Sequence, residues 1–147
     1  MRVPDESDWG DWKSDLDQSD AHRVFSGKTV QEVRHEFAMH PIERADNLRF
    51  MPPVPFQYYI CAFKDFLLSS DSKGHADAAS SYLRLLEDKL TNDPAIVMAV
   101  MPSLLPSVDS IAERQAFYEA DEDIYGSFSE IRDRLHRAYR IRLSGKT

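Results

Sequence analysis

The chain has 147 residues, of which 42% are hydrophobic, and this size suffices for one globular domain with a buried core. Its net charge of −7 opposes nucleic-acid binding, because neutralising phosphates requires clustered lysine and arginine. No apolar run approaches the roughly 18 residues of a membrane-spanning helix, and the first residues lack the apolar region of a signal peptide. The single cysteine, Cys61, allows neither a disulfide within the chain nor a zinc-ligand set. We therefore expect a cytoplasmic protein with no membrane contact.

The charge is unevenly distributed along the chain. Residues 1–20 contain seven acidic residues against two basic ones, whereas residues 130–147 contain six basic residues against two acidic ones. Either both ends are solvated or paired with each other, or the acidic end faces a basic partner. We expect residues 1–147 to form a single domain, with residues 1–20 as an acidic segment at its periphery.

The first elements are read from apolar spacing and from capping residues. Trp9, Trp12 and Leu16 have the spacing of one face of a short amphipathic helix within residues 5–20, although a glycine at position 10 weakens it. Thr29 and Glu32 have the form of a capping box, which predicts a helix from about residue 30 that stops at Pro41.

The strongest helix signal covers residues 55–69. Six apolar positions fall within one arc of a helical wheel: Phe56, Tyr59, Ile60, Phe63, Phe66 and Leu67. The other side of this helix carries Tyr58, Cys61 and Leu68 among polar residues. This pattern indicates a helix that packs on two sides, or one that leaves a side for a partner such as a second copy of the chain.

The second half of the chain is also expected to be helical. Residues 75–91 carry a narrow apolar face, and capping boxes predict helices over 110–120 and from Ser127 onward. The apolar run 95–101 fits a buried helix or strand, and we prefer a short helix because no other segment offers a strand to pair with. The predicted fold is an all-α, single-domain bundle of five to seven helices.

Several short motifs resemble binding sites but each lacks a required residue. Gly27-Lys28-Thr29 has no glycine five residues earlier, so we interpret it as a helix cap rather than a phosphate loop. His35 and His40 are five apart, which places them on diverging faces of a helix and opposes zinc binding. Residues 121–126 resemble the start of a calcium loop, but an arginine occupies its twelfth position, so we interpret them as a solvated turn. No cofactor or metal is predicted.

Residues 26–69 resemble a bacterial domain family of uncharacterised function. The resemblance lies in Leu48 to Met51, Phe56 to Phe63, and the lead-in from Gly27 to Val33; the family's helix reads approximately Phe-x-Tyr-Tyr-Leu-Pro-Ala-Phe. This chain departs at Cys61, where the family pattern has proline. The resemblance implies a small helical bacterial protein and supplies no activity, cofactor or catalytic residue.

Our leading hypothesis is a non-catalytic binding module, immunity- or antitoxin-like, whose acidic surface meets a basic protein partner. The candidate partner-binding residues are Trp9, Trp12, Asp8, Asp11 and Tyr58, because exposed tryptophan beside carboxylates is typical of interface hot spots. The opposing interpretation is that the tryptophans tie the terminus to the core.

Two other classes of function stay open at this point. One is a small enzyme whose site would be assembled from scattered residues, with His35, Glu36, His40, Cys61 or Tyr58 converging. The other is a structural homodimer formed through the second side of helix 55–69.

Overall fold

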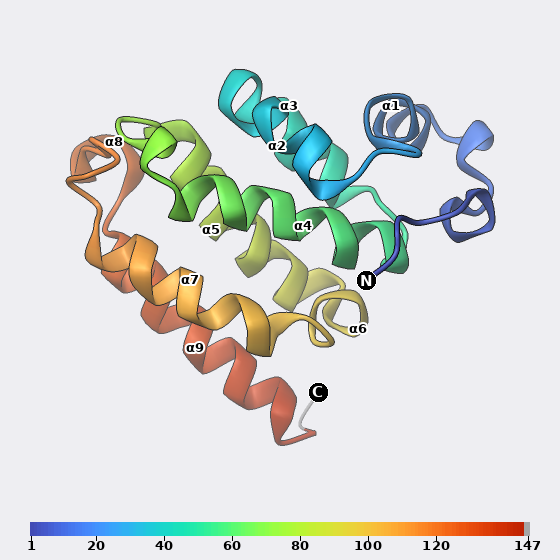
Figure 1. Cartoon of the computed structure of the whole chain (residues 1–147). Helices are drawn as coiled ribbons and strands as arrows, with labels where there is room; N and C mark the ends of the chain where they lie inside the picture. Colours follow the sequence, from blue (N-terminus) through green and yellow to red (C-terminus); the bar gives the residue numbers. More distant parts are fainter. Residues whose placement is uncertain (146–147) are drawn as a thin grey trace.

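A computed structural model describes residues 1–145, and every regular element within that range is helical (Figure 1). The elements in chain order are η1 (Glu6–Trp9), η2 (Trp12–Ser14), α1 (Leu16–Phe25), α2 (Val30–Met39), α3 (Pro41–Arg49), α4 (Pro53–Leu68), η3 (Ser70–Ser72), α5 (Ala76–Asn92), α6 (Pro94–Val97), α7 (Met101–Glu113), α8 (Glu122–Tyr125) and α9 (Phe128–Leu143), where η denotes a 3-10 helix. The predicted all-α class is confirmed. Within residues 1–145, seven of the helices have nine or more residues, and α6 and α8 are single turns of four.

Helices α4 and α5 form the centre of the bundle. Helix α4 packs against α2 on one side and α7 on another, while α5 packs against α3 and α9 (Figure 1). Nine of the 16 residues of α4 are buried, including Tyr58 on the side opposite the main apolar arc. Helix α4 therefore packs on two sides, which is the first of the two arrangements that its sequence pattern predicted.

Local signals located most of the helix boundaries. Thr29 and Glu32 form the predicted capping box at the start of α2, with the Thr29 side chain accepting from Glu32 N and Glu32 accepting from Thr29 N. The run 95–101 contains α6 and the first residue of α7, so the preference for helix over strand is confirmed.

Two expected elements were wrong. Gly10 takes a left-handed φ of 64°, which interrupts residues 5–20 into η1, η2 and the start of α1, and leaves Leu16 exposed. Ser110 does not open a helix but lies inside α7, which ends at Glu113. The helix tolerates Pro106 in its interior because the burial of apolar side chains such as Val108 offsets the lost backbone hydrogen bond.

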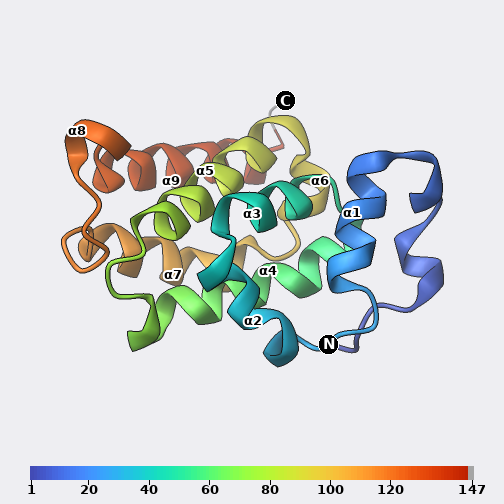
Figure 2. The same ribbon diagram turned by 90° about the horizontal axis from the view of Figure 1, so that it is seen from above.

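The acidic N-terminal stretch makes no ion pair with the basic C-terminal stretch in the described part of the chain. The N-terminal segment lies with α1 at one end, and α8 lies at the opposite end (Figure 2). Among residues 1–145, no ion pair joins the acidic stretch 1–20 to the basic stretch that begins at 130. The interpretation in which the two charged ends pair with each other was therefore wrong for the described residues.

Candidate functional site

The tryptophan candidates are mainly structural. Trp9 is only 1% exposed and packs against His22 and Tyr59, with ring centroids 5.3 and 6.2 Å away. Trp12 is half-buried, stacks on His22 at 3.8 Å, and donates its indole N–H to Glu6 over 2.7 Å. Trp9 therefore does not present a surface to a partner, which corrects that expectation: apolar burial of the ring anchors the segment to the core.

The acidic side chains beside the tryptophans are largely occupied by local contacts. Asp8 accepts from Asp5 N at 2.9 Å and pairs with Arg2 at 2.8 Å, and these contacts hold its pKa below the ordinary value. Asp15 caps α1 by accepting from two backbone N–H groups. Asp11, in contrast, is exposed and makes no side-chain cap hydrogen bond. Of the predicted acidic candidates, only Asp11 therefore presents an uncommitted carboxylate.

Tyr58 lies on the second side of α4, and the chain itself covers much of that side. The Tyr58 hydroxyl accepts a hydrogen bond from Val30 N over 3.1 Å, and the side chain is buried. Cys61 beside it is half-buried, and burial raises the pKa of its thiol above the ordinary value. The face expected to serve a second copy is thus reduced mainly to the exposed Leu68.

The residues proposed for a scattered enzyme site lie on different elements: Tyr58 and Cys61 on α4, His35 and Glu36 on α2, and His40 at the C-cap of α2. Tyr58 and Cys61 line a hollow of about 340 Å³ that contains no histidine. His35 and Glu36 lie on α2, with 3.4 Å between His35 Nε2 and Glu36 Oε2, and Glu36 is engaged by Arg44 at 2.7 Å. Within residues 1–145, no group of three His, Cys, Asp or Glu side chains is arranged to hold a metal ion.

A different part of the chain carries exposed acidic groups without ion pairs, namely the acidic connection, residues 113–125, which runs from the end of α7 through α8; one of them, Asp121, caps α8 by accepting from Asp123 N over 2.8 Å. Its carboxylates are all exposed, and none forms an ion pair with another residue in the range 1–145: Glu113, Glu119, Asp121, Glu122 and Asp123. The one arginine in the segment, Arg114, lies instead over the rings of Phe117 and Tyr118. The charge of this segment therefore faces solvent uncompensated.

The same segment exposes a large apolar side chain. Ile124 in α8 is 73% exposed, although a buried position is the usual place for isoleucine. It follows directly after Glu122 and Asp123 in the same helical turn. An exposed aliphatic side chain that follows two unpaired carboxylates in one helical turn is a combination suited to contact with a partner that is both basic and apolar.

One glutamine side chain holds the acidic connection in shape. Gln115 Nε2 donates to the carbonyls of Ala120 (2.9 Å) and Gly126 (2.8 Å), while Gln115 Oε1 accepts from Phe128 N at 2.8 Å. Its amide thus satisfies three backbone groups on both sides of α8. These three hydrogen bonds constrain the backbone on either side of α8.

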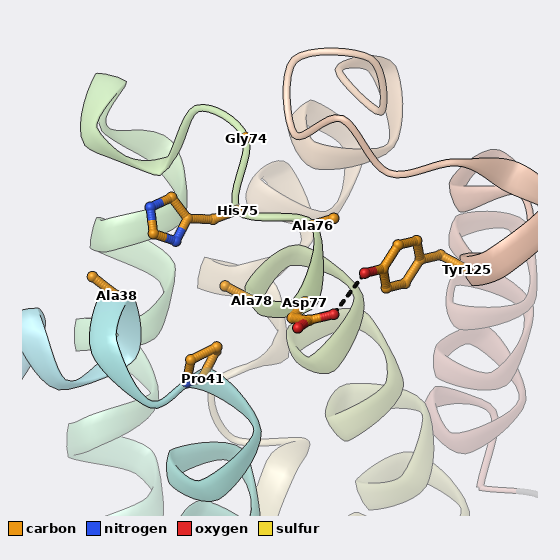
Figure 3. A pocket seen from close by; sticks show the side chains of 8 residues that line it. All are labelled: Ala38, Pro41, Gly74, His75, Ala76, Asp77, Ala78 and Tyr125. Carbon is orange, nitrogen blue, oxygen red and sulfur yellow. Dashed lines mark hydrogen bonds between the residues drawn. The ribbon is translucent and has the colours of Figure 1, made fainter.

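Contacts to α5 fix the far side of α8. Arg84 donates to the Tyr125 carbonyl over 3.0 Å, and the Tyr125 hydroxyl donates to Asp77 over 2.6 Å (Figure 3). The hydrogen bond to Asp77 holds the pKa of Tyr125 above its ordinary value of 10. Both contacts tie α8 to the helix behind it.

Two hollows flank α8. One, of about 310 Å³, lies between the α2–α3 corner, the start of α5 and Tyr125, and is lined by His75 and Asp77 among small residues (Figure 3). The other, of about 380 Å³, has three alanines and Gln115 in its wall, with Glu113 and Glu122 also lining it. Alanine methyl groups beside carboxylates match the chemistry of a long basic side chain, which buries its aliphatic stem and keeps its charge near the acids.

Sequence reasoning located part of this segment but did not show that its acids would form no ion pair within residues 1–145 after folding. The acids at 121–123 were recognised and interpreted as a solvated turn, and nothing in local spacing shows whether an acid will find a cation after folding. A second missed feature is Lys89, which is 1% exposed and donates to the Arg49 carbonyl at the end of α3 over 2.6 Å. Its charge complements the negative end of that helix dipole and serves the fold.

Comparison with protein-family models, with curated proteins and with solved structures finds no match to this chain. Among the described helices, none combines the length and the apolar character that crossing a membrane requires. Functional inference therefore rests on the geometry and charge of the acidic connection.

Proposed function

We propose that this chain is a non-catalytic protein-binding module, of the immunity or antitoxin kind, that binds a basic protein through the acidic connection. The observation that carries the proposal is the concentration of five exposed carboxylates without ion pairs in residues 113–125, a segment in which Ile124 is also exposed. Complementary charge would speed encounter and select the partner, while the apolar contact would supply binding free energy.

The rigidity of the segment supports this role. Gln115, Arg84 and the hydrogen bond from Tyr125 to Asp77 hold α8 on both sides, so that binding would order few groups. The hollow lined by Glu113 and Glu122 would receive one lysine or arginine of the partner, its stem lying along the alanine methyl groups.

The experiment compares two double charge reversals that change the net charge equally. Glu122→Lys with Asp123→Lys alters the acidic connection, whereas Asp11→Lys with Asp17→Lys alters exposed acids of the N-terminal segment. Proteins captured at low salt by the immobilised wild-type chain are identified, and the affinity of each purified protein is then measured by calorimetry. We expect a protein of high isoelectric point whose binding weakens with salt and is lost only in the Glu122/Asp123 variant.

An equal loss in both variants, or no loss in either, would reject the acidic connection as the binding surface. Ile124→Ser and Leu16→Ser provide a second matched pair, because both side chains are large, apolar and exposed. Only the first substitution is expected to weaken binding.

A further inference from the structure

At the other end of the molecule, residues 1–14 form a strap that lies across α1 and α4 (Figure 2). Only Pro4 and Trp9 are buried within the strap. The Trp9 ring lies against His22 of α1 and Tyr59 of α4, but its buried indole N–H has no hydrogen-bond acceptor in the described structure. The main anchor of the strap therefore depends on apolar contact and leaves a polar group desolvated.

The polar contacts between the strap and α1 lie near the surface. The Glu6 carboxylate accepts from Trp12 Nε1 at 2.7 Å and lies 3.0 Å from His22 Nε2, while Trp12 stacks on the same imidazole. Ser19 Oγ donates to the Trp12 carbonyl over 3.0 Å. The Glu6 side chain is 65% exposed, so water competes directly for the contacts that it makes.

The tyrosines of α4 near Trp9 form hydrogen bonds that do not involve the strap. The Tyr59 hydroxyl shares its one proton between the carbonyls of Phe25 and Lys28, 2.6 and 2.7 Å away, and the Tyr58 hydroxyl accepts from Val30 N. None of these partners belongs to residues 1–14. Removing the strap would expose apolar surface but would break none of these bonds.

We propose that the strap opens as a unit while the helices stay folded, and that opening uncovers an apolar slot between α1 and α4 that Trp9 otherwise fills. Local opening at a free energy below that of global unfolding is expected where few buried contacts hold a segment. The strap meets this condition because Trp9 is its principal buried contact and its polar contacts with α1 are few, made to His22 and Ser19.

The chain carries its own reporters of this motion. Its two tryptophans both lie in the strap, and its single cysteine lies in the hollow that Met1 lines together with Tyr58. Tryptophan emission and the labelling rate of Cys61 therefore follow the strap, whereas circular dichroism at 222 nm follows the helices.

The test is a urea titration of the full chain, read by both signals, for the wild type, Glu6→Ala and the control Asp11→Ala. Asp11 is exposed and makes no side-chain cap hydrogen bond, so its removal leaves the ties of the strap intact. In the wild type, tryptophan emission should shift to the red at lower urea than the loss of helical signal.

Glu6→Ala should lower the midpoint of the emission change further and raise the labelling rate of Cys61 severalfold in the absence of urea. It should leave the midpoint of the helical signal in place, and Asp11→Ala should change neither signal. Emission and helical signals that coincide in all three proteins would overturn the proposal, because the strap would then unfold only with the core. An unchanged Cys61 labelling rate in Glu6→Ala would also count against it.

Discussion

The molecule has two acidic regions that look alike in sequence and differ in what folding does with them. In residues 5–20, carboxylates cap helices and pair with neighbours, as Asp15 does at α1 and Asp8 does with Arg2. In the acidic connection, five carboxylates form no ion pair within residues 1–145, only Asp121 among them caps a helix, and Ile124 is exposed. Acid content alone therefore does not show which carboxylates are left for other contacts, because folding engages some of them in ion pairs and helix caps and leaves others exposed without either.

The largest loss of stability is expected from substitution of Gln115, whose amide forms hydrogen bonds to the backbone on both sides of α8 in the acidic connection. Gln115→Ala removes the partner of three partly buried backbone groups, so we expect the free energy of unfolding to fall by about 2 kcal/mol. Chemical denaturation measures the change, with the exposed neighbour Glu113→Ala as a control that should stay within about 0.5 kcal/mol of the wild type. A Gln115 variant as stable as that control would show that the connection does not depend on this side chain.

The next largest loss of stability is expected from substitution of Tyr59, whose ring packs against Trp9 of the N-terminal segment. Tyr59→Phe removes the donor to two carbonyls and should lower the free energy of unfolding by about 1 kcal/mol. Burial raises the pKa of Tyr59 to about 12. Because the folded state holds this proton more tightly, the contribution is complete below the ordinary pKa of 10 and is lost as pH rises through 12. Wild type and Tyr59→Phe should therefore converge in stability across that window; a constant difference would contradict the assignment.

A single carboxylate from each region gives a direct contrast. Asp15→Ala removes the cap of α1 and should cost about 1 kcal/mol, whereas Asp123→Ala should change the free energy of unfolding by less than about 0.5 kcal/mol. Thermal or urea unfolding of the two variants measures both values. An equal loss of unfolding free energy in the two variants would mean that the acids of the connection stabilise the fold, and would contradict a role for them in binding alone.

The smallest expected effect is a response of the strap to acid. Hydrogen bonds from His22 and Trp12 hold the pKa of Glu6 below its ordinary value of 4.5. A lowered folded pKa means that the contribution is present above pH 4.5 and is lost as pH falls through the folded value. Tryptophan emission should therefore change below pH 4.5 in the wild type and show no such step in Glu6→Ala. An identical acid step in both proteins would assign it to another group.

The sequence predicted the parts of the fold that depend on short-range patterns. The apolar arc of Phe56 to Leu67 located α4, and Thr29 with Glu32 located the start of α2, because period and capping are properties of neighbouring residues. The prediction of a helix start at Ser110 was wrong for the same reason. The local pattern fits a cap, but α7 extends through that position, with buried side chains such as Val108 on its inner face.

The candidate site was less predictable because it depends on distances between elements. Trp9 and Ile124 both sit beside acids in sequence, yet one is buried and the other is exposed. Nothing near Gln115 indicates that its amide will reach Gly126 and Phe128 across α8. Whether a carboxylate meets an arginine is likewise decided by packing between helices.

The most direct test of the central proposal is a map of where a basic ligand binds. Amide shifts in a proton–nitrogen NMR spectrum are followed while a synthetic amphipathic peptide of lysine and leucine is added at low and at high salt. We expect the changes to concentrate in residues 113–125 and around the hollow lined by Glu122, to weaken with salt, and to leave residues 5–20 nearly unaffected. Changes centred on residues 5–20, or spread evenly over both acidic regions, would contradict the account.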